Sequence, residues 1–170
     1  MAIALERSIV TDVAVAESLA QARALWHLRE SIPLAQADDG PNIKHDIALP
    51  VSAIPDFVAR TDAALQTAFP GARVVNFGHL GDGNLHYNLQ APAGMTPQDF
   101  LAKHEHAANA IVYDAVVARG GSISAEHGIG ALKSEELAQR KSAVALEMMR
   151  AIKRALDPQG TLNPGRVLQA

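Results

Sequence analysis

Two histidines, an aspartate and three glycines stand close together at residues 78–88, which read GHLGDGNLHYN. Asp-Gly is the strongest short signal for a β-hairpin, and the residues on both sides suit strands. A two-residue loop at Asp82 and Gly83 would place His79 directly opposite His86. The Cβ atoms of opposed residues lie about 4.5–5.5 Å apart, so both imidazoles could reach one metal ion. The alternative is a polar hairpin tip with two solvated histidines.

A second unusual stretch, SISAEHGIGALK at residues 122–133, sets a carboxylate and an imidazole side by side. Because the chain has no cysteine, a metal site must use histidine and carboxylate ligands. Glu126 could supply the third ligand beside the two hairpin histidines and leave a coordination position open, as in catalytic zinc sites. The same ligand set fits non-haem iron. His127 would then be a base beside the ion, whereas the stretch on its own is also typical of an ordinary loop.

Two basic residues are candidates for binding an acidic substrate. Arg29 can grip a carboxylate with a bidentate fork, and Lys44 can add a second positive charge. A small hydroxy or oxo acid would match this arrangement of charges. The alternative for Arg29 is a cation that complements the C-terminus of a helix. Composition and spacing indicate no particular reaction.

The elements that must position these residues follow from periodicity and caps. We expect an α+β fold, in which helices cover one face of a ferredoxin-like antiparallel sheet and a C-terminal helical segment follows. Such a fold usually has one more strand before the first strand here, so we expect an incomplete domain. The predicted elements are a helix at 13–31, a loop at 35–42, a strand at 43–49, a helix from 52 or 53 to 68, the hairpin at 72–90, a helix at 97–119, and short helices at 134–140 and 142–156.

The bulk properties narrow the class of protein. With 170 residues and 48% hydrophobic residues, the chain can bury a sizeable core. A net charge of −3 argues against electrostatic binding to nucleic acid. No apolar run approaches the roughly 20 residues of a membrane span, and no signal peptide is evident. The expected location is therefore the cytoplasm, with any membrane association arising through an electron-acceptor partner.

Three motifs in this order and spacing resemble the C-terminal part of FAD-linked oxidases: GHLGDGNLHYN, SAEHGIGALK and LDPQGTLNPGRVL. The group is that of D-lactate dehydrogenase, D-2-hydroxyglutarate dehydrogenase and the flavin-binding subunit of glycolate oxidase, within the vanillyl-alcohol-oxidase-like flavoproteins. The resemblance covers the chain from residue 13 onward. It implies that residues 1–120 are an N-terminally truncated substrate (cap) domain. Residues 121–170 would be the active-site loop and a helical return that packs on the FAD domain.

The resemblance also implies a role for individual residues. A divalent metal, zinc first and manganese or iron as alternatives, would be bound at the hairpin and the second motif, and the substrate beside it. One departure is Pro33, where a threonine would be expected in a D-2-hydroxyglutarate enzyme. The implied residues are His79, His86 and Glu126 for the metal, His127 for proton removal, Arg29, Lys44 and Asn88 for the substrate, and Glu126 and Asn163 beside the cofactor.

The implied activity is oxidation of a D-2-hydroxy acid to the 2-oxo acid, with hydride transfer to FAD. No GxGxxG follows a predicted strand, so we expect FAD to be held by an N-terminal domain or a flavin subunit outside this chain. The chain alone would then neither retain FAD nor turn over. The resemblance allows a homodimer and leaves the electron acceptor unidentified. The alternatives are a metal-dependent hydrolase with the same ligand set and a hydroxy-acid-binding module without redox activity.

Overall fold

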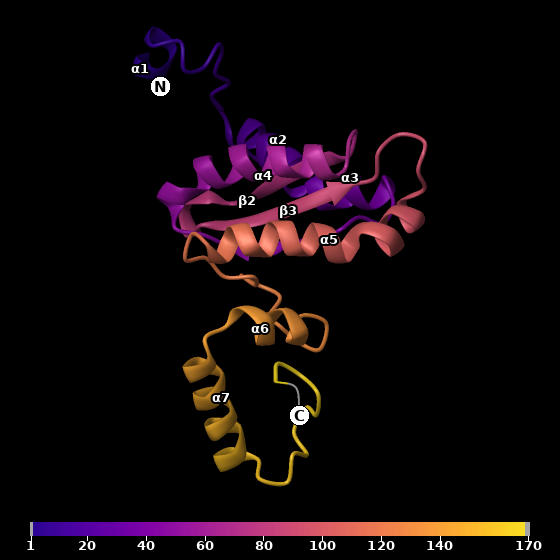
Figure 1. Ribbon diagram of the computed structural model, residues 1–170. Coiled ribbons are helices and arrows are strands. Elements are labelled where there is room, and N and C mark those ends of the chain that lie inside the picture. The colour runs from indigo at the N-terminus through magenta and orange to yellow at the C-terminus, as the bar shows by residue number, and fades with distance from the viewer. Residues whose placement is uncertain (1, 169–170) are drawn as a thin grey trace. The chain divides into compact units, whose positions relative to one another are not determined.

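The computed structural model describes residues 2–168, and it confirms the α+β class (Figure 1). The chain divides into two compact units between Gly40 and Pro41. None of the described helices combines the length and the apolar character needed to cross a bilayer.

The first unit is helical, and its boundaries differ from the prediction. It contains α1 (Ala2–Glu6), α2 (Leu19–Glu30) and α3 (Ile32–Asp38). The helix expected from residue 13 begins only at Leu19, because the hydroxyl of Ser18 caps it by accepting the Gln21 N–H at 3.2 Å. Pro33 does not stop helix formation here. It lies in the first turn of α3, where its missing N–H needs no partner, so most of the expected loop is helix.

The second unit contains a small antiparallel sheet with strand order β1-β3-β2. Thr96 caps the longest helix by accepting the Asp99 N–H at 3.1 Å, as its Thr-Pro start predicts. The two short C-terminal helices also lie where they were expected. The elements are β1 (Asp46–Ala48), η1 (Val51–Ala53), α4 (Ile54–Ala68), β2 (Arg73–His79), η2 (Leu80–Asp82), β3 (Asn84–Gln90), α5 (Pro97–Val117), α6 (Ser134–Arg140) and α7 (Ala143–Leu156).

The two faces of β3 have different tasks. Leu85, Tyr87 and Leu89 belong to the hydrophobic core with residues of α4 and α5, which run alongside β2 and β3 in Figure 1. The Tyr87 ring contacts Phe57 of α4 edge to face, with ring centroids 5.2 Å apart. Side chains alternate along a strand, so His86 lies on the opposite face, away from the core.

The edge of β1 that faces away from β3 carries a single further bridge. The Ala48 N–H donates to the Ser122 carbonyl at 3.0 Å, and the Ser122 N–H donates back to the Ala48 carbonyl at 2.8 Å. The order strand, helix, two strands, helix is thus followed by a residue at the fourth strand position of a ferredoxin-like sheet. The extra strand expected before residue 43 therefore has its counterpart after α5, reduced to one bridge. This bridge fixes the start of the second motif beside β1.

Candidate metal centre

The hairpin register differs from the prediction by two residues. His79 pairs with Asn84, and Phe77 pairs with His86. The predicted two-residue loop at Asp82 and Gly83 is wrong, because residues 80–82 form the short helix η2. A slip of two residues leaves each side chain on its original face, since the strand period is two. The two histidines are therefore diagonal neighbours on one face, with ring centroids 6.5 Å apart.

Glu126 reaches both histidines from the second motif. Its Oε1 lies 3.6 Å from His79 Nε2, and its Oε2 lies 3.9 Å from His86 Nε2. One candidate ligand atom from each residue falls within 4.8 Å of the others. Two ligands at about 2.0–2.1 Å from a tetrahedral ion are about 3.4 Å apart, so the observed separations fit a divalent cation. The structure thus brings the three predicted ligands together.

The surroundings of the three ligands leave one side open. The side chains of His79 and Glu126 are 56% and 45% exposed, whereas that of His86 is 18% exposed. His86 packs on the Phe77 ring with centroids 5.0 Å apart. The Asn84 side-chain amide donates to Glu126 Oε1 in a short hydrogen bond. Two of the ligands are therefore held by neighbours, and solvent or a substrate can approach from the exposed side.

Asp46 is a site residue that sequence reasoning missed. It lies on β1 directly opposite His86, and its Oδ2 accepts three consecutive backbone N–H groups, from Ala125 at 3.1 Å and from Glu126 and His127 at 2.9 Å each. Burial raises the pKa of the Asp46 carboxyl, but these N–H groups outweigh burial and hold it below its usual value. The sequence placed Asp46 beside Lys44 on a strand face but offered no motif that links it to residues 80 positions later.

His127 lies next to the metal ligands. Its backbone is fixed by Asp46, and its ring is 6.1 Å from that of His86, with 30° between the ring planes. The residue is exposed. An imidazole in this position is accessible to a molecule bound at the open side of the three ligands.

The predicted substrate residues are not all brought together. Asn88 lies two residues after His86 and so on the same face, but it is buried and its Oδ1 accepts the His45 N–H at 3.3 Å. Lys44 precedes β1 and is exposed. Arg29 lies in the last turn of α2, in the first unit, and its predicted contact with substrate stays a prediction.

Asn163 belongs to the C-terminal tail of the second unit. It is exposed, has a positive φ of 47°, and accepts the Arg166 N–H on its carbonyl at 3.3 Å. The Val167 N–H donates to the Gly130 carbonyl at 2.7 Å, so the tail returns to the loop that follows His127. The predicted cofactor role of Asn163 stays a prediction.

Comparison with known proteins gives a consistent result. A family model described as "FAD linked oxidases, C-terminal domain" matches residues 1–167. D-2-hydroxyglutarate dehydrogenase of Xanthomonas citri pv. viticola is 42% identical over 97% of this chain and 34% of its own length. The enzyme of the same name from Stutzerimonas stutzeri is 38% identical over 97% of this chain and 35% of its length. The mitochondrial enzyme of Arabidopsis thaliana is 38% identical over 96% of this chain and 28% of its length. The chain thus spans about a third of these relatives.

Proposed function

The chain belongs to the family of C-terminal domains of FAD-linked oxidases, and we propose that it forms the metal- and substrate-binding part of an FAD-dependent D-2-hydroxy acid dehydrogenase. The observation that carries the proposal is the convergence of His79, His86 and Glu126, with His127 beside them. Three ligands and one open side are typical of a catalytic rather than a structural metal site.

The two absent groups would supply complementary chemistry. A divalent cation, zinc first and manganese or iron as alternatives, would act as a Lewis acid on a hydroxyl or carboxylate oxygen. FAD, held by a domain or subunit outside this chain, would accept the hydride. The ligand separations support the cation, whereas no described residue tests the flavin.

The residues of this chain then divide the work. His127 accepts the proton of the substrate hydroxyl on an imidazole nitrogen while the Cα–H bond is broken. Lys44 and Arg29 bind the substrate carboxylates and so fix the orientation of that C–H bond. Asn88 completes the polar face of β3 behind His86. The exposed ring of His127 and the exposed ammonium group of Lys44 support these roles, because both groups are open to a ligand.

The substrate class comes from the relatives and is narrower than the geometry. The relatives are named for D-2-hydroxyglutarate, which carries two carboxylates and would suit two basic side chains. Pro33 departs from the threonine expected in such enzymes, so D-lactate is the second substrate to test. The Arabidopsis relative is named as mitochondrial, and a cytoplasmic location of this chain stays a prediction.

Residues 121–170 are proposed to pack on the FAD domain. Support comes from α7, which carries large exposed apolar side chains at intervals of four residues and thus along one side of the helix. A charged face would be expected there if water were its only neighbour. The side chains are Val144, Met148, Ile152 and Leu156, which are 73%, 62%, 58% and 77% exposed.

The proposal is tested in the intact flavin enzyme that contains this chain. Anaerobic addition of D-2-hydroxyglutarate or D-lactate should bleach the flavin absorbance, and metal analysis should find about one divalent ion per chain. His79→Ala should lose the ion and the bleaching. His106→Ala is the matched control, because His106 is an exposed histidine of α5.

Three results would contradict the proposal. An oxidised flavin together with metal-dependent ester or amide hydrolysis would identify a hydrolase that uses the same three ligands. Binding of hydroxy acids with no bleaching, in a form loaded with FAD and metal, would identify a binding module. Full metal content in His79→Ala would show that the ion is bound elsewhere.

A further inference from the structure

We infer that Asp46 is a positioning residue, which holds loop 124–127 and through it places Glu126 and His127 at the metal centre. The inference rests on the proposed function for the metal. Its geometry is independent of that function, because it depends on contacts within the second unit.

Several donors converge on one oxygen of Asp46. Its Oδ2 accepts the N–H groups of Ala125, Glu126 and His127, and the Ser124 hydroxyl lies 3.4 Å from the same atom. Successive backbone N–H groups that converge on one anion form a concave binding site of the kind called a nest. The side chain that fills this nest is only 4% exposed. The loop is therefore folded around the Asp46 carboxylate.

The place of Asp46 in the sheet links it to a metal ligand. It pairs directly with His86 across β1 and β3, so the anchor of the loop and a metal ligand share one strand pair and one face. The Ala48–Ser122 bridge fixes the chain just before the loop. Loop 124–127 is thus tied to β1 at two points, and Glu126 arrives beside His86 by way of these ties.

Apart from these contacts, no described residue of the second unit fixes the backbone of Glu126. Its side chain receives one hydrogen bond from Asn84 and is otherwise half-exposed. Gly128 follows with a φ of +75° and has open space around it, so the chain after His127 is not held by packing. Removing the carboxylate should release the loop while leaving the hairpin histidines in place.

The test compares Asp46→Asn and Asp46→Ala with the wild-type chain in two measurements. Asparagine keeps an acceptor oxygen but loses the charge that strengthens hydrogen bonds to N–H groups, whereas alanine removes both. Amide hydrogen exchange of the metal-free chain should show at least about tenfold faster exchange at residues 125–127 in Asp46→Asn, and faster still in Asp46→Ala. Exchange in the core strand β3 should stay slow.

The second measurement is zinc affinity, by competition with a chelating dye. Substitution of groups that orient metal ligands costs about 10–100-fold in affinity, and we expect a loss in this range for Asp46→Asn. Asp62→Asn is the matched control, because Asp62 is also a carboxylate that accepts a part-buried hydrogen bond, from the Tyr87 hydroxyl. It should lower stability without changing zinc affinity. If Asp46→Ala does not fold, Asp46→Asn and Asp46→Ser provide the comparison.

Each outcome separates the two proposals. Unchanged exchange at residues 125–127 in folded Asp46→Asn, or unchanged zinc affinity in a wild-type chain that binds zinc, overturns the inference. Loss of zinc with the amides still protected would make Asp46 a direct ligand and would also overturn it. A wild-type chain that binds no divalent ion contradicts the proposed function, while faster exchange in Asp46→Asn would still support the positioning of the loop.

Discussion

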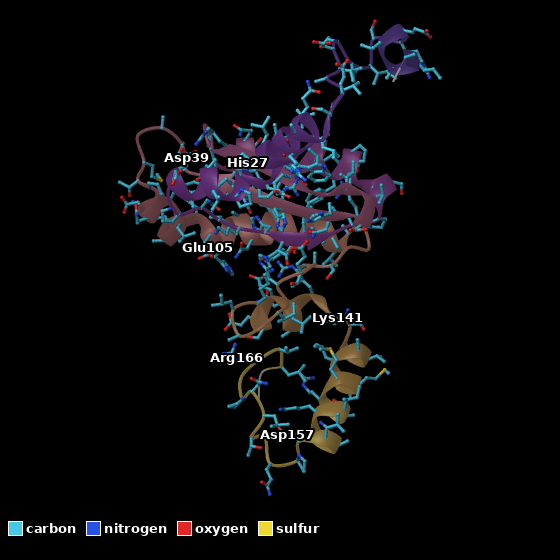
Figure 2. The ribbon with its side chains drawn as sticks, turned by 180° about the vertical axis from the view of Figure 1, so that it is seen from behind. His27, Asp39, Glu105, Lys141, Asp157 and Arg166 are labelled. Atoms are coloured by element: carbon cyan, nitrogen blue, oxygen red, sulfur yellow. The ribbon has the colours of Figure 1, made fainter. Side chains whose placement is uncertain are left out.

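At the residue scale, the histidines of this chain differ in what surrounds their rings. His127 presents an exposed ring and is held through its backbone, whereas His86 is packed on Phe77. His45 is buried, at 1% exposure, between the Tyr87 carbonyl and the Asn109 side chain. An exposed ring can exchange protons with a substrate, but a buried one that bonds on both nitrogens serves the fold. The exposed and the buried rings therefore require different experiments. Figure 2 labels a further histidine, His27, which lies on α2 in the first unit.

His127→Asn should separate proton transfer from metal binding. Loss of a general base typically costs about 10²–10⁴-fold in rate, and we expect a fall in kcat within this range with little change in KM. The metal content should stay at the wild-type level, because His127 is not one of the three ligands. Steady-state kinetics with a dye acceptor and metal analysis of the intact enzyme check both points. A parallel loss of metal would mean that His127 binds the ion.

The buried ring of His45 also fixes a tautomer. The Tyr87 carbonyl at 2.7 Å can only accept, so His45 Nδ1 carries the proton. In the neutral ring Nε2 is then an acceptor, and the Asn109 amide, 2.9 Å away, must turn its nitrogen toward it. Burial lowers the pKa of His45 to about 4, although both hydrogen bonds oppose this. The folded state therefore holds the neutral ring well below the usual histidine pKa.

The stability of the fold should consequently fall in acid in a way that depends on His45. Above pH 6.5 the ring is neutral in both states, and between pH 6.5 and about 4 only the unfolded chain takes up the proton. The free energy of unfolding should drop by about 3 kcal/mol across this window and level off below it. Urea titrations with a chelator present should show this slope in wild type and in His106→Gln. A slope of equal size in His45→Gln would contradict the assignment.

At the element scale, the hairpin shows what the sequence could and could not determine. Alternation of side chains correctly predicted the face that carries both histidines, despite a two-residue error in register. The turn itself was mispredicted, because Asp82 and Gly83 form part of a longer connection. Leu49 donates its N–H to the Gly83 carbonyl at 2.9 Å, and a contact between segments so far apart leaves no local signal. Helix caps were predictable where a hydroxyl residue stood before a run of helix formers, as at Thr96.

Gly83 should be the least replaceable residue of the hairpin tip. It has a φ of +74°, and an added Cβ would lie 2.1 Å from the Leu49 carbonyl oxygen. Gly83→Ala should therefore lower the free energy of unfolding by more than about 1 kcal/mol. Gly81→Ala is the matched control, because nothing lies within 4 Å of its Cβ position. Equal urea midpoints for the two variants would show that the tip relaxes freely.

At the scale of the whole molecule, the core and the metal centre belong to one unit. Every residue of the main hydrophobic cluster lies between Ile43 and Ile123, and the three ligands and Asp46 lie in the same unit. The sequence predicted the α+β class and the ligands from motifs but not this division. The Asp46 contacts could not be predicted, because β1 and loop 124–127 are joined only through the folded sheet.

Residues 41–170 alone should therefore fold and bind zinc about as tightly as the full chain. The physical reason is that removal of residues 1–40 takes away no core residue and no ligand. Circular dichroism, thermal unfolding and zinc competition would check this. Substrate affinity in the intact enzyme should fall in Arg29→Ala, since the proposed carboxylate contact comes from the removed part. A truncated chain that is unfolded would show that the first unit supports the second.

The position of Glu126 relative to the hairpin has a consequence for folding as well as for chemistry. Asn84, at the tip beside the two histidines, and Glu126 are 42 residues apart in the sequence. A captured ion would join these distant stretches as a reversible cross-link that the denatured chain lacks. By mass action, free zinc at 100 times its dissociation constant should add about 2.7 kcal/mol to the unfolding free energy. The concentration of zinc would then set how much of the chain is folded, before any substrate arrives.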